Sequence, residues 1–232
     1  MEIIETEYPT EEAGQALTEA LKTHTKQPIL LMLSGGSAFS ILEYVSSDVL
    51  GSHITLTVLD ERYSTDPTIN NYAQLQQTTF FAACVEHGVE TIPMTVQEGE
   101  SLTEMSARFE KTLRTWRKQN PSGVVIATMG VGHDGHTAGI FWSEHGISFD
   151  DDKWVVGYVV PKEVNTYQER VTVTNTYLRT EIAQAIVYAV GEEKYNIVQN
   201  IYSHNAEFRV PANIFREIKD LTIYTTANST SN

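Results

Sequence analysis

The chain of 232 residues is 41% apolar, which is enough to bury a sizeable core, and we expect one domain over residues 1–226. Its formal net charge of −14 argues against a nucleic-acid partner, because phosphate backbones are bound mainly by clustered Lys and Arg. No apolar stretch approaches the roughly 20 residues that span a bilayer, so we expect no membrane partner.

The first five residues contain neither a basic region nor an apolar segment, so we expect no secretory leader and a cytoplasmic protein. Apolar residues recur at helical spacing over residues 13–21, which predicts a helix. The apolar run Ile29–Leu33 then predicts a central strand. Gly35 and Gly36 break that strand, and a further helix is expected to begin near Ala38.

A second strand is predicted over residues 54–59, and the segment Asp60-Glu61-Arg62 follows it directly. The Arg62 guanidinium can hold a phosphate or pair with a neighbouring carboxylate, and the sequence leaves both readings open. A helix is predicted from about residue 71 to residue 88. It contains the only cysteine, Cys84, which sits in an apolar helical pattern and is expected to pack in the core.

Ser101 and Glu104 have the spacing of a capping box, and an apolar stripe from Met105 to Trp116 predicts the helix that follows. Further strands are predicted over residues 124–129, 154–160, 171–174, 185–190 and 221–225. The alternation of strands and helices predicts an α/β domain with a mainly parallel, Rossmann-like sheet flanked by helices on both faces. The small polar residues 227–232 form a tail that we expect to fray.

The segment Gly132-His133-Asp134-Gly135-His136-Thr137 comes just after the predicted strand 124–129. Ligands bind outside the carboxyl ends of the strands in open α/β sheets, so this segment is a candidate site. A neutral imidazole at His136 can take a proton from water, while the Asp134 carboxylate fixes its tautomer and stabilises the imidazolium. Asp134 and His136 are therefore the candidate catalytic pair.

The break after the first predicted strand is a candidate anion site. Gly35 and Gly36 permit close backbone approach, and the Ser37 hydroxyl lies at the expected start of a helix. The same residues also fit an ordinary connection between a strand and a helix. They lack the lysine of a nucleotide-binding phosphate loop, which argues against an ATPase. The cations that an acidic chain would gather around such an anion include Arg62, Arg170 and Lys194.

The sequence also offers residues for two other chemistries, a metal site and a serine nucleophile. Side chains of metal-ligating type cluster at His133, Asp134, His136, Glu144 and His145. The nearest histidines are three residues apart in a glycine-rich loop, whereas zinc hydrolases usually place two at i and i+4 on a helix, so we expect no metal. No Gly-x-Ser-x-Gly elbow is present, so Ser34 and Ser37 are binding candidates rather than nucleophiles.

Taken in order, six segments resemble the 6-phosphogluconolactonase family, and they span most of the chain. They are 33–37 (Leu-Ser-Gly-Gly-Ser), 60–62 (Asp-Glu-Arg), 70–72 (Asn-Asn-Tyr), 130–138 (Gly-Val-Gly-His-Asp-Gly-His-Thr-Ala), 170–174 (Arg-Val-Thr-Val-Thr) and 191–194 (Gly-Glu-Glu-Lys). That family and the glucosamine-6-phosphate deaminases and isomerases form one sugar-phosphate superfamily with a parallel-sheet α/β fold.

The resemblance implies hydrolysis of 6-phospho-D-glucono-1,5-lactone to 6-phospho-D-gluconate in the oxidative pentose phosphate pathway, without a cofactor. It implies that His136 activates the attacking water and that Asp134 supports it. The implied substrate and phosphate contacts are Gly35, Gly36, Ser37, Asp60, Arg62, Arg170 and Lys194. The implied partner is thus a small phosphorylated sugar lactone, and the oligomeric state stays open.

The main competing enzyme is a deaminase, which follows Asp-Gly-His with Ile-Ala-Phe-Asn-Glu-Pro and has a tyrosine after Asp-Glu. Here Phe141 occupies the place of that glutamate and Arg62 the place of that tyrosine, and both differences favour the lactonase. The chain also departs from the lactonase pattern at Gly139, Ile140 and residues 142–143, which leaves a different sugar-phosphate lactone open. A third reading is a sugar-phosphate sensor that keeps the fold without turnover.

Overall fold

The computed structural model describes residues 1–142, 149–150, 152–205 and 207–227. Within these residues, seven strands form one sheet: β1 (Glu2–Thr6), β2 (Ile29–Leu33), β3 (Ile54–Val58), β5 (Glu90–Thr91), β6 (Val124–Gly130), β9 (Ile182–Tyr188) and β10 (Leu221–Thr226). Their order across the sheet is β1-β10-β9-β6-β2-β3-β5, and every neighbouring pair is parallel. The predicted mainly parallel sheet is confirmed.

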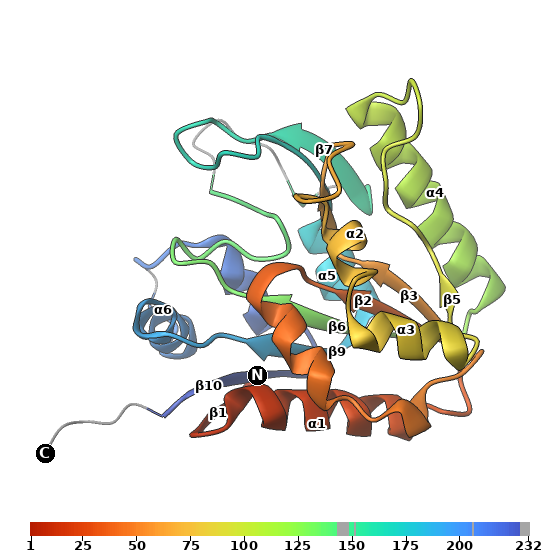
Figure 1. Cartoon of the computed structure of the whole chain (residues 1–232). Helices are drawn as coiled ribbons and strands as arrows, with labels where there is room; N and C mark the ends of the chain where they lie inside the picture. The colour runs from red at the N-terminus through yellow and green to blue at the C-terminus, as the bar shows by residue number, and fades with distance from the viewer. Residues whose placement is uncertain (143–148, 151, 206, 228–232) are drawn as a thin grey trace, which may run out of the picture.

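Helices flank this sheet (Figure 1), as the alternating pattern predicts. The α-helices are α1 (Pro9–Thr23), α2 (Asn71–Leu75), α3 (Thr79–Glu86), α4 (Leu102–Gln119), α5 (Asn175–Glu181) and α6 (Glu192–Tyr202). The 3-10 helices are η1 (Gly36–Tyr44), η2 (Ser47–Val49) and η3 (Pro211–Glu217). The predicted capping box is present, because the Ser101 side chain accepts from the Glu104 backbone while the Glu104 side chain accepts from the Ser101 backbone.

A second, antiparallel sheet stands apart from the first. It consists of β4 (Asp60–Arg62), β8 (Glu169–Val173) and β7 (Val155–Val159), with β8 in the middle. The sequence pattern places strands near β7 and β8 but does not separate them from the main sheet. It also treats residues 60–62 as the end of a strand, whereas they form a strand of their own that pairs with β8. Pairing between segments more than a hundred residues apart leaves no local signal.

Three helix and strand predictions differ in detail from the structure. The expected helix over residues 71–88 is divided into α2 and α3, because the Thr78 side chain caps a new helix by accepting from the backbone of Phe81. The helix expected near Ala38 is a 3-10 helix that begins at Gly36. Strand β1 was not predicted, because none of its five residues is fully buried and they form no apolar run.

The core lies on both sides of the central strands. All five residues of β2 are buried, as expected for a strand covered on both faces, and Cys84 is buried in the same core. The chain runs outward from β2 to β3 and β5, then returns to the other side of β2 with β6. The carboxyl ends of β2 and β6 therefore flank a topological switch point, where parallel α/β sheets bind ligands.

Residues 228–232 of the expected frayed tail lie outside the described residues. In the part of the chain that the structure describes, no helix has the length and apolar character needed to cross a membrane.

Candidate active site

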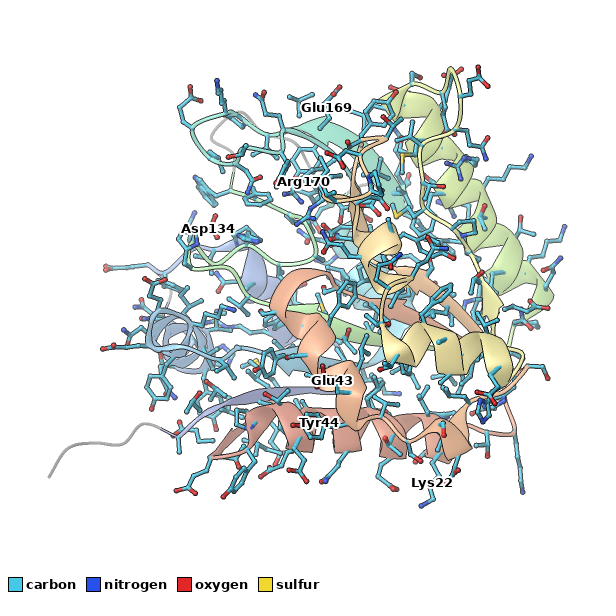
Figure 2. All side chains as sticks on the ribbon, viewed as in Figure 1. Lys22, Glu43, Tyr44, Asp134, Glu169 and Arg170 are labelled. Carbon is cyan, nitrogen blue, oxygen red and sulfur yellow. The ribbon has the colours of Figure 1, made fainter. Side chains whose placement is uncertain are left out.

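A cavity of about 510 Å³ lies at the carboxyl ends of β2 and β6. Most of the residues predicted for the site line it: Gly35, Gly36, Ser37, Asp60, Arg62, His136, Arg170 and Lys194. Asp134 does not line the cavity but contacts His136. Figure 2 shows Asp134 and Arg170 at the same end of the molecule, away from Lys22 on α1. The fold thus brings together residues spread over most of the sequence.

His136 is held by Asp134 within the loop after β6. Nδ1 of His136 lies 2.5 Å from Oδ1 of Asp134, which also accepts from the His136 backbone amide at 3.1 Å. Burial raises the pKa of Asp134, but the hydrogen bond and charge of His136 outweigh it and lower this pKa to about 2. Asp134 is therefore a carboxylate, which can only accept. The Nδ1–H group donates to it, and Nε2 of a neutral His136 carries the free lone pair.

Gly132 is needed for this arrangement. A Cβ at this position would lie 2.0 Å from Nδ1 of His136, so any other residue would push the imidazole away. The Gly132 amide also donates to the carbonyl oxygen of His136 at 2.8 Å, which closes the loop on itself. Gly132 thus both closes the loop and leaves room for the imidazole of His136.

Aromatic contacts cover the His136 ring on one face. The rings of His136 and Phe141 are stacked, with centroids 4.2 Å apart and planes inclined by 25°. The guanidinium carbon of Arg170 lies over the same Phe141 ring, 4.7 Å from its centroid. Phe141 is buried and does not itself line the cavity, so it supports His136 from behind the cavity wall.

The segment between His136 and Phe141 is clamped by the second sheet. The Tyr158 hydroxyl on β7 donates to the carbonyl oxygen of Gly139 and accepts from the Phe141 amide at 3.3 Å. The Thr172 hydroxyl on β8 donates to the carbonyl oxygen of Ala138. Gly139 has φ +66, and a Cβ there would lie 2.5 Å from Oδ2 of Asp60. The β4-β8-β7 sheet therefore positions the segment that carries Phe141.

Arg170 is buried and already engaged by protein groups. Its Nη1 lies 3.4 Å from Oδ2 of Asp60, its Nη2 donates to Oδ1 of Asn165 at 3.2 Å, and its Nε donates to the carbonyl oxygen of Tyr167 at 3.3 Å. Burial lowers the pKa of Arg170, and the nearby Asp60 carboxylate opposes that shift. The Asp60–Arg170 pair thus forms a fixed wall of the cavity.

Lys194 and Arg62 have fewer protein partners than Arg170. Nζ of Lys194 donates to Oγ of Ser37 at 3.3 Å, and burial lowers the pKa of this lysine. Nη1 of Arg62 donates to the carbonyl oxygen of Ile69 at 2.6 Å, and its guanidinium lies over the Tyr167 ring. Nε of Arg62 is buried with no hydrogen-bond partner among the described residues. Both cations therefore have donors left for an anion.

The glycines of the first loop do two different jobs. A Cβ on Gly35 would lie 2.1 Å from Oδ1 of Asn71, so the backbone packs directly on helix α2. Gly36 has φ +68 with open space around it, and η1 begins there. The first amides of a helix have no partner within it, so the loop presents donors beside Ser37 and Lys194.

Glu61, between the two predicted contacts Asp60 and Arg62, has a structural task. It is fully buried, and its carboxylate accepts from the backbone amides of Arg62, Asn71 and Tyr72. Burial raises the pKa of Glu61 to about 8, against the effect of these hydrogen bonds. It thereby ties the start of α2 to β4, and Asn71 to the cavity wall.

Several cavity residues were not predicted as site residues: Asn71, Asn165, Thr166, Tyr167 and Glu193. The connection between β7 and β8 supplies three of them, and its composition gives no sign that it folds over the cavity. The stacking of Phe141 on His136 was also not predicted, because the sequence does not show how the two rings are oriented.

The structure describes three of the five side chains considered as metal ligands, those of His133, Asp134 and His136. Glu144 and His145 lie outside the described residues. Across residues that the structure does describe, no group of three or more His, Cys, Asp and Glu side chains gathers as metal ligands do.

Comparison with known proteins agrees with this architecture. Solved structures described as 6-phosphogluconolactonase match from Thermotoga maritima (20% identity, TM-score 0.71, 97% of each chain) and Trypanosoma brucei (18%, 0.74, 97% of this chain and 95% of that one). One from Trypanosoma cruzi matches at 22% identity with a TM-score of 0.76, over 99% of this chain and 97% of that one. At these identities the likeness establishes the fold. Curated protein sequences give no match.

A family model adds evidence from the sequence itself. The model described as glucosamine-6-phosphate isomerases/6-phosphogluconolactonase matches residues 7–224. This match runs from the residues just after β1 to β10 and so includes every segment around the cavity. The chain therefore belongs to the glucosamine-6-phosphate isomerase/6-phosphogluconolactonase family.

Proposed function

We propose that this protein is a 6-phosphogluconolactonase, which hydrolyses 6-phospho-D-glucono-1,5-lactone to 6-phospho-D-gluconate in the oxidative pentose phosphate pathway. One observation carries the proposal: a single cavity holds an imidazole oriented by a carboxylate and two cations with unused donors, Arg62 and Lys194. The solved structures of similar fold that are described as 6-phosphogluconolactonases support it.

In the proposed reaction, Nε2 of His136 takes a proton from water while the water oxygen bonds to C1 of the lactone. The carbonyl becomes an oxyanion, and the carbonyl re-forms as the bond between C1 and the ring oxygen breaks. The imidazolium returns its proton to the ring oxygen, and the open-chain acid ionises to the gluconate. Asp134 stabilises the imidazolium throughout, because its low pKa keeps it charged.

The phosphate serves as the handle that fixes the substrate. Lys194, Arg62 and the amides near Gly36 offer charge-assisted hydrogen bonds to a dianion. Binding at C6 holds the sugar at one end, so that the lactone carbonyl at the other end is oriented for attack. Arg170, with each guanidinium nitrogen engaged, contributes its charge and shapes the wall.

The stack on His136 favours hydrolysis over deamination. An aromatic ring, Phe141, lies against the imidazole at the position where the deaminase pattern has a glutamate. A phenyl ring moves no proton, so this position lacks the carboxylate with which the deaminase pattern aids ring opening of an amino sugar.

The test compares two substrates with the wild-type protein in the presence of a metal chelator. Freshly prepared lactone should be hydrolysed well above its spontaneous rate, and glucosamine-6-phosphate should release no ammonia. Ammonia release without lactone hydrolysis would overturn the proposal in favour of the deaminase. Binding of 6-phosphogluconate with no turnover of either substrate would favour the sensor.

The proposed reaction also supports a cytoplasmic location, because its substrate is a small sugar phosphate. The single cysteine fits a reducing compartment, since Cys84 is a buried free thiol whose pKa is raised to about 12 by burial. Absence of a nucleic-acid partner stays a prediction from the charge of −14.

A further inference from the structure

Phe141 is the aromatic neighbour of the proposed general base. Phe141 is 3% exposed, and its ring contacts both the His136 imidazole and the Arg170 guanidinium. The imidazole of His136 is stacked on the ring, with centroids 4.2 Å apart. The guanidinium carbon of Arg170 lies 4.7 Å from the centroid of the same Phe141 ring.

These contacts complete the restraint of the imidazole. The hydrogen bond to Asp134 fixes Nδ1 but still permits the ring to rotate about the axis through that bond. A ring stacked at 25° opposes this rotation, because any tilt would lose the face-to-face contact. The Phe141 ring also excludes water from the covered face. Proton exchange with a water nucleophile is then confined to Nε2 on the cavity side.

Phe141 is itself held at its backbone amide and at its ring. Its amide donates to the Tyr158 hydroxyl at 3.3 Å, and Tyr158 also donates to the carbonyl oxygen of Gly139. Arg170 lies over its ring and is fixed in turn by Asp60. Residues of the second sheet thus fix the position of Phe141, and Phe141 in turn fixes the orientation of the His136 imidazole.

We propose that Phe141 is a positioning residue that holds the His136 imidazole in the orientation needed to deprotonate water. The inference rests on the proposed function for its kinetic consequence, and on geometry alone for the contact. It predicts that removing the aromatic ring, at constant apolar character, lowers turnover while leaving substrate binding in place.

The experiment uses Phe141→Leu, with Phe109→Leu on α4 as the matched control. Phe109 is equally buried, but it lies on α4, and among the described residues no ring contact joins it to His136. In Phe141→Leu we expect kcat for the lactone to fall about 10- to 100-fold, because a misplaced base loses its near-attack geometry, while KM stays within about twofold. Phe109→Leu should lower thermal stability and leave both constants unchanged.

A second readout needs no turnover. Stacking shifts the His136 ring-proton resonances upfield through the ring current of Phe141, and this shift should disappear in Phe141→Leu but persist in Phe109→Leu. Unchanged His136 resonances, or an unchanged kcat, would overturn the proposal. If the wild type fails to hydrolyse the lactone, the proposed function fails, and the resonances still decide the contact. If Phe141→Leu does not fold, Phe141→Met fills a similar volume without a ring and gives the same readouts.

Discussion

Each of the groups around the imidazole acts on a different degree of freedom of His136. Asp134 fixes the tautomer, and Phe141 covers a ring face. Gly132 keeps its space clear. The nitrogen left over, Nε2, is the one that the proposed chemistry uses. The contacts around His136 therefore leave the lone pair of Nε2 free to accept a proton from water.

The Asp134 carboxylate should couple stability to pH. Because its pKa in the folded protein lies near 2, below the unfolded value of about 3.9, its stabilisation is complete above about pH 5 and is lost progressively as the pH falls through 2. Asp134→Asn removes this contribution. Urea unfolding at pH 6 should therefore show the wild type more stable than the variant, and at pH 2.5 the difference should shrink. A difference that grows at low pH would contradict the proposed pairing.

The Lys194 ammonium should act through the substrate phosphate. In Lys194→Gln we expect KM for the phosphorylated lactone to rise about 10- to 100-fold, the range for one hydrogen bond to a charged group. Hydrolysis of glucono-1,5-lactone, which has no phosphate, should change little. Lys22→Gln is the matched control, because Lys22 is exposed on α1 at a distance from Asp134 and Arg170 (Figure 2). Equal losses with both lactones would show that Lys194 does not bind phosphate.

At the scale of elements, the turn between β2 and η1 joins the phosphate cradle to helix α2. Gly35 packs on Asn71, and Glu61 binds the first amides of α2 from β4. The cradle and the wall of the cavity are thus set by one junction of three elements. A side chain added at Gly35 should therefore displace Asn71 and disturb α2, whereas one added at Gly36 should not disturb α2.

This difference predicts unequal effects for two neighbouring substitutions. Gly35→Ala places a Cβ 2.1 Å from Oδ1 of Asn71 and should destabilise the fold by about 1–3 kcal/mol through overpacking. Gly36→Ala meets no atom and should cost only about 1–2 kcal/mol for its positive φ. Amide hydrogen exchange in α2 should rise with Gly35→Ala alone. Faster exchange in α2 with Gly36→Ala would show that the two positions are not separable.

At the scale of the whole molecule, strand order decides where the site lies. The reversal between β2 and β6 opens a crevice, and the second sheet closes one side of it. A chain with net charge −14 places Arg62, Arg170 and Lys194 around this crevice. Three cations thus line the cavity in which an anionic substrate would bind.

The sequence predicts the parts of this arrangement that depend on local pattern. The buried strands β2 and β6 are apolar runs, and the residues after them are glycines, a histidine and an aspartate, so their place at one edge of a parallel sheet follows. The second sheet could not be predicted, because β4 pairs with β8 across more than a hundred residues. The position of Tyr167 at the cavity and the stacking of Phe141 on His136 depend on that sheet, so neither could be predicted.

The most direct measurement is the rate of lactone hydrolysis with chelator present, for the wild type and for His136→Ala, after subtraction of the spontaneous rate. We expect the wild type to accelerate hydrolysis and the variant to lose about 10²- to 10⁴-fold in kcat, the usual contribution of a general base. The variant should still bind 6-phosphogluconate, because the phosphate contacts remain. Full turnover by His136→Ala would contradict the assignment of His136 as the base.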